Sequence, residues 1–161
     1  MRKVALISAA LGAAIVFGGP VRAQAPALYG ATVNLEQAKK AATAAQAEAA
    51  KNGWMMAITV VGPTGDLVYF EKMDNTQYGS VSIAQHKARA AAIFRRPTKA
   101  FEDRVSQGGA GITALTLDGM IASDGGFPLV VGGKMIGAIG CSGGTGTQDG
   151  QTCTAGVNAL K

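Results

Sequence analysis

The fold is decided by residues 125–149, which read GGFPLVVGGKMIGAIGCSGGTGTQD. Phe127–Val131 and Lys134–Cys141 are typical of strands, and Gly132-Gly133 between them tolerates the positive φ of a tight turn. The segment therefore predicts a β-hairpin. From Met135 onward the second strand is uncharged on both faces of its pleat, so we expect it in the middle of a sheet that is covered on both sides.

Two glycines of this strand, Gly137 and Gly140, remove side chains where something large approaches the backbone. The approaching group is either a helix or a flat ligand. Alanines at positions 88, 91 and 92, in a segment predicted to be helical, indicate the same close approach. Tight packing of a helix on the sheet and a cleft for a ligand both remain open.

The rest of the sequence predicts helices around two hairpins. Asn34 and Gln37 have the spacing of a capping box at the start of the first helix, and Pro97 ends the second. A glycine-rich stretch, 107–126, leaves room for a short strand near Thr116–Ala122. The expected elements are helix Leu35–Lys51, strands Met55–Val61 and Leu67–Glu71, helices Ser80–Arg95 and Thr98–Ser106, the central hairpin, and helix Asp149–Leu160.

The expected fold class follows from how the predicted strands are connected, which is by hairpins and not by βαβ crossovers. The order α-ββ-α-α-ββ-α predicts an α+β domain with an antiparallel sheet of about five strands and helices packed on it.

The beginning of the chain is expected to be an export signal. A basic start at Arg2 and Lys3 precedes the apolar run Val4–Gly19, and Val21–Ala23 has the small-x-small pattern of a cleavage site. The protein is therefore expected to be periplasmic or secreted. The division predicted for the chain is a signal peptide at 1–23, a loose leader at 24–33 and one domain at 34–161.

The composition indicates an ordered domain, because 48% of the residues are hydrophobic and only 16% are charged. Without the three basic residues of the leader, 12 basic and 10 acidic residues leave a net charge of +2, which is too small to indicate nucleic acid. After the leader, no stretch is long and apolar enough for a membrane span. So few charges favour a surface that is hidden in a homo-oligomer.

Cys141 and Cys153 are the only cysteines. On the last predicted helix, Cys153 would face the strand that carries Cys141, and an oxidising compartment favours a disulfide between them. Two buried free thiols are the alternative. A zinc site made from these cysteines and His86, the only histidine, would lack a fourth soft ligand.

No recognisable catalytic constellation is present. The glycine loop at 143–148 lacks the Lys-Ser/Thr of a phosphate-binding loop and the third glycine of a dinucleotide fingerprint. A structural turn with a helix cap at Thr147 explains it more simply. His86 has no Gly-x-Ser-x-Gly nucleophile to serve, and no Cys-x-x-Cys occurs. Whether the protein is an enzyme is left open.

The helix predicted over Ser80–Arg95 carries the candidate ligand-binding residues. His86 borders an apolar face, so it either lies at the edge of the core or in a subunit contact, or presents its imidazole to a ligand such as the metal of a planar macrocycle. Arg95 and Arg96 complement the helix dipole, and their guanidinium groups also suit the carboxylates of a ligand.

Three segments together resemble the GlcG/HbpS family, the so-called haem-degrading domain. They are KARAAAIFRRPT at 87–98, VGPTGDLVYFEKMD at 61–74, and 126–144 with the following Gln148-Asp149. The similarity extends from Leu35 to Leu160. It implies a small α+β domain that forms homo-oligomers, and it implies haem binding, since secreted HbpS-type members bind haem and are linked to iron and oxidative-stress handling.

The function expected from these observations is an exported haem-binding protein with a role in haem or iron handling or in haem degradation. A macrocycle needs an apolar wall, a base for iron and cations for its propionates. His86 is the first candidate for the iron, and Tyr78 and Met73 are other possible ligands. Arg95 and Arg96 are the candidates for the propionates.

Two alternatives belong to other functional classes. The first is a binding or accessory protein for a small organic acid, as glycolate-operon relatives suggest, in which Arg96, Thr98 and the loop at 143–147 hold a carboxylate without a metal. The second is a structural partner of an envelope sensor, in which oligomer surfaces act and no pocket does.

Overall fold

A five-stranded sheet forms the centre of the structure, a computed structural model that describes residues 25–161. Its central strand is β5 (Lys134–Ser142), which is flanked by antiparallel β4 (Gly126–Val131) and antiparallel β2 (Ala57–Val61). The expected central hairpin is therefore confirmed. Beyond β2 lies β3 (Leu67–Lys72), its antiparallel hairpin partner. The expected signal peptide at 1–23 lies outside the described residues.

The fifth strand differs from the expectation. It is β1 (Leu28–Tyr29), which pairs parallel with the start of β5 and makes the sheet mixed rather than antiparallel. This segment was expected to be a loose leader, because two residues show no periodicity. The short strand expected near Thr116–Ala122 is absent from the described chain, where the 3₁₀ helix η1 (Gly109–Thr116) and a turn take its place.

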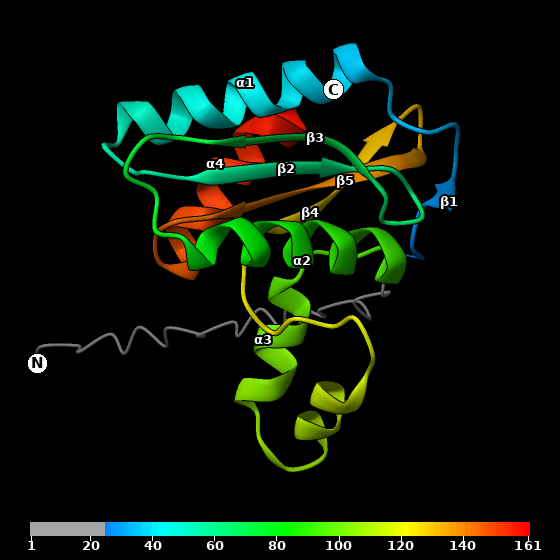
Figure 1. Cartoon of the computed structure of the whole chain (residues 1–161). Helices are drawn as coiled ribbons and strands as arrows, with labels where there is room; N and C mark the ends of the chain where they lie inside the picture. The colour runs from blue at the N-terminus through cyan, green and yellow to red at the C-terminus, as the bar shows by residue number, and fades with distance from the viewer. Residues whose placement is uncertain (1–24) are drawn as a thin grey trace, which may run out of the picture.

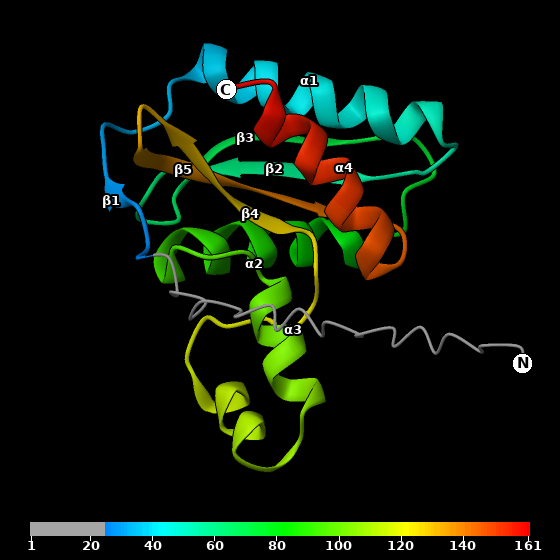
Figure 2. The same cartoon turned by 180° about the vertical axis from the view of Figure 1, so that it is seen from behind.

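Helices cover the sheet on both faces, so the domain has three layers (Figures 1 and 2). α1 (Leu35–Lys51) and α4 (Gly146–Asn158) lie on one face, and α2 (Gly79–Phe94) lies on the other. α3 (Lys99–Ser106) and η1 project away from the sheet beyond α2 and form an arm. The predicted α+β class is confirmed.

Local sequence explains where the two helices of the first face begin. The side chain of Asn34 accepts a hydrogen bond from the backbone N–H of Gln37, as the spacing predicted. In α4 the cap is Thr145 rather than the expected Thr147, because Thr145 Oγ1 accepts from the N–H of Gln148. Five alanines of α1 at helical spacing are buried and allow a close approach to the sheet.

A β-bulge changes the alternation of β5. Leu129 and Val130 of β4 face Gly137 and Met135, so Ile136 is the extra residue. As a result Met135 packs in the cluster under α2, whereas Ile139 packs in the core under α1 and α4. With strict alternation of side chains along the strand, as expected from the sequence, Met135 and Ile139 would both lie on the same face of the sheet.

The two glycines of β5 are in contact with protein. A Cβ atom at Gly140 would lie 2.2 Å from the carbonyl oxygen of Ala84 and 2.5 Å from the backbone nitrogen of Ala88. A Cβ atom at Gly137 would lie 2.2 Å from the carbonyl oxygen of Val61. The group that approaches Gly140 is therefore helix α2, and the glycine and alanine surfaces contain no ligand cleft in the described structure.

A disulfide joins Cys141 of β5 to Cys153 of α4, with their Cα atoms 5.7 Å apart. Both side chains are buried in the core, which fixes α4 to the central strand. Trp54, the only tryptophan, lies three residues before β2 and is half-buried against the same core.

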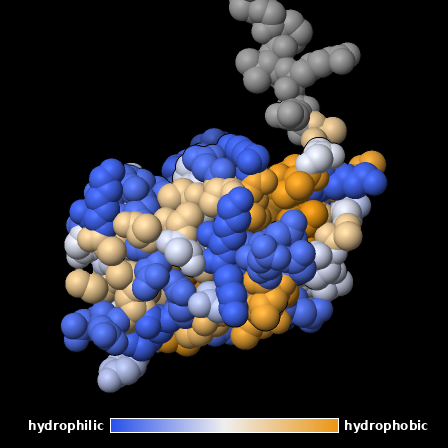
Figure 3. Space-filling model, turned by 90° about the horizontal axis from the view of Figure 1, so that it is seen from above, coloured by the Kyte–Doolittle hydropathy of each residue, from blue (hydrophilic) through white to orange (hydrophobic). Residues whose placement is uncertain are grey.

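The outer surface is divided into polar and apolar parts. Seen from the α1 side (Figure 3), hydrophobic surface gathers toward the end of the molecule that carries β1. Exposed apolar side chains at this end are Leu28, Tyr29, Val130 and Val131. Among residues 25–161, no helix has both the length and the hydrophobicity needed to cross a membrane.

Candidate functional site

An open cleft of about 510 Å³ lies at the β1 end of the sheet. We call it the Tyr29 cleft. It is bounded by β1 and the residues after it, by the turn between β2 and β3, and by the last turn of α2. Its volume falls within the range of small-molecule sites. The lining residues are Tyr29, Gly30, Thr32, Pro63, Thr64 and Ile93.

Arg95 contacts Tyr29, one of the residues that line this cleft. It follows α2 with φ +52°, in the left-handed conformation that often ends a helix, and its guanidinium carbon lies 5.2 Å from the centre of the Tyr29 ring. The Tyr29 hydroxyl donates to the carbonyl oxygen of Ala92 at 3.2 Å. The end of α2 therefore holds both the aromatic wall and the cation.

A second arginine lies on the neighbouring side of the cleft. A Cβ atom at Gly65 would come within 2.9 Å of Arg89 Cγ, so the stem of Arg89 packs against the turn that contributes Pro63 and Thr64. In the same turn, Thr64 Oγ1 donates to Asp66 Oδ2 at 2.5 Å. The guanidinium of Arg95, the stem of Arg89 and the carboxylate of Asp66 thus lie beside residues of the lining.

His86, the first candidate for an iron ligand, is exposed and does not line the Tyr29 cleft. It precedes Ile93 by seven residues on α2, which is close to two full turns or about 10 Å, and therefore lies on the same side of the helix. Tyr78 precedes the other end of α2 and is 90% exposed, and Met73 is half-buried against the core.

Arg96 and Thr98 do not line the Tyr29 cleft and contact other parts of the structure. The guanidinium of Arg96 lies 5.8 Å from the centre of the Phe101 ring, and its Nε donates to the carbonyl oxygen of Phe94 at 3.1 Å. Thr98 is buried, and its hydroxyl accepts from the N–H of Gly126 at 2.9 Å. None of the predicted ligand-binding residues lines the cleft itself, and Arg95 alone contacts a lining residue, Tyr29. The ligand contacts themselves stay predictions.

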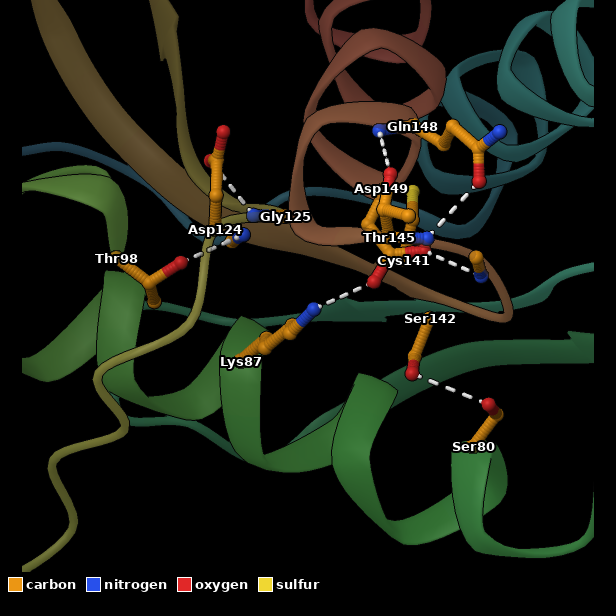
Figure 4. A network of polar contacts seen from close by, with 12 residues as sticks. Ser80, Lys87, Thr98, Asp124, Gly125, Cys141, Ser142, Thr145, Gln148 and Asp149 are labelled. Carbon is orange, nitrogen blue, oxygen red and sulfur yellow. Dashed lines mark hydrogen bonds and ion pairs between the residues drawn. The ribbon is translucent and has the colours of Figure 1, made fainter. Parts of the chain in front are cut away.

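A buried ion pair lies between α2 and α4 (Figure 4). Lys87 Nζ is 2.7 Å from Asp149 Oδ2, and the two side chains are 1% and 3% exposed. Asp149 Oδ1 also accepts from the N–H of Gly144 at 2.9 Å. Burial raises the pKa of Asp149, while the hydrogen bonds from Lys87 and Gly144 oppose that rise.

The start of β4 is fixed by the same polar region. Asp124 Oδ1 accepts from the N–H of Gly125, and the N–H of Asp124 donates to Glu102 Oε2 at 2.8 Å. Burial raises the pKa of Asp124, and the nearby Glu102 carboxylate adds to that rise. A Cβ atom at Gly126 would lie 2.4 Å from the carbonyl oxygen of Lys87. The region joins α2, α3, β4 and α4, and neither its lysine nor its aspartates line the Tyr29 cleft.

Sequence reasoning missed Tyr29 and the ion pair. Tyr29 lies in a segment whose two strand residues carry no pattern, so no signal was available. Lys87 did carry a signal, because a lysine in the apolar stripe of a predicted helix requires a buried acidic partner. The partner, Asp149, is 62 residues away in the sequence.

These features define a small three-layer α+β domain with an open cleft whose aromatic wall, Tyr29, is in contact with an arginine. The family described as haem degrading protein HbpS-like matches residues 33–158. The chain belongs to this family.

Relatives match this chain in sequence, and solved structures match it in fold. Protein GlcG of Escherichia coli K12 is 39% identical over 99 residues, which are 62% of this chain and 72% of GlcG. A double mutant of HbpS from Streptomyces reticuli has a TM-score of 0.74 and 28% identity, over 94% of this chain and 99% of that chain. The PduOC:heme complex has a TM-score of 0.73 and 23% identity, over 81% of this chain and 96% of that chain.

Proposed function

We propose that this protein is an exported haem-binding protein that handles haem or iron. The observation that carries the proposal is the Tyr29 cleft, a hollow with aromatic and apolar walls whose Tyr29 ring contacts Arg95, in a member of the HbpS-like family. The similarly folded PduOC was solved as a complex with heme, which supports the same ligand class.

The residues at the cleft fit part of what haem requires. Tyr29, Pro63 and Ile93 would shield an apolar edge of the macrocycle, and Arg95 would hold a propionate. His86, on the same side of α2, is the proposed iron ligand through an imidazole nitrogen. When bound, haem would supply a redox-active iron, and the chain would bind and orient it.

A haemin titration of residues 24–161 tests the proposal. We expect a shifted Soret band that saturates, and we expect His86→Ala to weaken binding about tenfold or more, because an axial ligand to iron is lost. Gln85→Ala is the matched control, since Gln85 is the exposed neighbour of His86 on α2. An unchanged spectrum throughout the wild-type titration would rule out haem binding.

Export and assembly are part of the same proposal. The Cys141–Cys153 disulfide supports a periplasmic or secreted location, because disulfides persist in oxidising compartments. We also propose a homo-oligomer. Exposed apolar side chains on the arm support it, namely Ile112, Leu115 and Leu117.

A metal-free organic acid is the second candidate ligand, favoured by the guanidinium of Arg95 at the cleft. Thermal-shift measurements separate the candidates, since a ligand that binds only the folded state raises its melting temperature. Stabilisation by glycolate and not by haemin would favour the organic acid. Stabilisation by neither would favour the structural partner of an envelope sensor.

A further inference from the structure

We propose that Arg95 receives a carboxylate of the bound ligand in the Tyr29 cleft and that Arg96 does not. This inference rests on the proposed haem binding and deepens it, because it places the propionate edge of the macrocycle at the end of α2. The two arginines are neighbours in the sequence and are equivalent candidates there.

The position of Arg95 is determined by its backbone and by Tyr29. Arg95 ends α2 in a left-handed backbone conformation, which glycine adopts at less cost than other residues. At this position the side chain leaves the helix, and its guanidinium lies over the Tyr29 ring. The Tyr29 hydroxyl donates to the carbonyl oxygen of Ala92 near the end of α2, and this bond helps to orient the ring beside Arg95. A stacked guanidinium keeps its N–H groups in the plane of the fork, where a carboxylate binds with two hydrogen bonds.

The guanidinium of Arg95 forms no ion pair in the described part of the chain, so it can pair with a carboxylate of a ligand. Among residues 25–161, the ion pairs are Lys87 with Asp149 and Lys99 with Glu102 and Asp103, and none includes Arg95. Asp66, the carboxylate of the neighbouring turn, accepts from Thr64. A half-buried cation beside an apolar cleft complements a ligand that joins a flat apolar body to a carboxylate, which is the chemistry of haem.

Arg96 faces the arm. Its guanidinium lies over the Phe101 ring of α3, and its Nε already donates to a backbone carbonyl oxygen. The two adjacent arginines thus differ in surroundings while sharing charge and size. Arg96 therefore provides a matched control within the same chain.

The test compares haemin with haemin dimethyl ester, in which both propionates are blocked. Binding of each is measured by Soret titration for the wild type, Arg95→Gln and Arg96→Gln. We expect Arg95→Gln to weaken haemin binding about tenfold, because a charge-assisted contact is lost, and to leave binding of the ester unchanged. Arg96→Gln should leave both affinities within about twofold of the wild type.

Three results would overturn the inference. They are equal losses for the two arginine variants, no loss for Arg95→Gln, and an equal loss of haemin and ester binding by Arg95→Gln, which would assign Arg95 a structural role. The melting temperature of each variant is measured to detect that last case. Failure of the wild type to bind either compound is a different outcome, which would reject haem binding itself.

Discussion

Lys87 is the largest fully buried side chain in the described structure, and it is charged. It lies at the contact between α2 and the start of α4, where its only ion-pair partner among residues 25–161 is Asp149. A buried charge is costly unless it is paired and hydrogen-bonded. This pair therefore holds the end of β5, the glycine loop and α2 in one arrangement.

Removal of Lys87 should destabilise the protein strongly. We expect Lys87→Met to lower the free energy of unfolding by about 3–5 kcal/mol, because the Asp149 carboxylate is left buried without a cation. The double variant Lys87→Met/Asp149→Asn should regain most of this loss. The measurement is urea unfolding at neutral pH.

The pH dependence of this defect follows from the raised pKa of Asp149. A carboxyl group whose pKa is higher in the folded state favours folding while it is protonated, and this contribution is lost as the pH rises through the folded-state pKa. The deficit of Lys87→Met should therefore shrink as the pH falls toward 4. Lys99→Met is the control, because Lys99 forms an exposed pair. Equal deficits in the two variants would contradict the proposed role of the buried pair.

At the scale of elements, local signals predicted most of the architecture. The capping box at Asn34 and the glycine pair at 132–133 identify α1 and the central hairpin, because both depend on neighbouring residues. β1 and the bulge at Ile136 could not be predicted, since they depend on pairing between distant segments. The Tyr29 cleft was missed for the same reason, as it joins three segments that are far apart in the chain.

The disulfide between β5 and α4 provides a prediction at this scale. Cys141→Ala/Cys153→Ala should unfold with a free energy about 3 kcal/mol below that of the oxidised wild type, because a closed loop restricts the unfolded chain. Denaturant unfolding measures the difference, and the wild type reduced during unfolding is the control. Equal stability of oxidised and reduced wild type would show that the bond contributes nothing.

The molecule as a whole carries exposed apolar residues on the arm that projects beyond α2. Phe101, Ala114 and Met120 form a small core of their own inside the arm, so its outer apolar side chains are not needed for its folding. An exposed apolar group of this kind marks an interaction surface. The arm is the part of the described structure that we propose as the contact between copies.

Substitution on the arm should therefore change assembly. We expect Leu115→Asp to reduce the molar mass measured by size-exclusion chromatography with light scattering, because a charge is placed in the proposed contact. Leu67→Asp is a matched control on β3, since Leu115 and Leu67 are both 57% exposed. A monomeric wild type, or an unchanged mass for Leu115→Asp, would contradict the oligomer contact.

Trp54, the only tryptophan, is an intrinsic fluorescence donor at a known position in the fold. Trp54 lies three residues before β2 and Pro63 of the cleft lies two residues after it, so the strand and its flanking residues separate the indole from the cleft by at most about 30 Å. Energy transfer from indole to a porphyrin falls steeply with separation. The degree to which emission is dimmed at saturation thus reports which end of the sheet the porphyrin occupies, without any label being added.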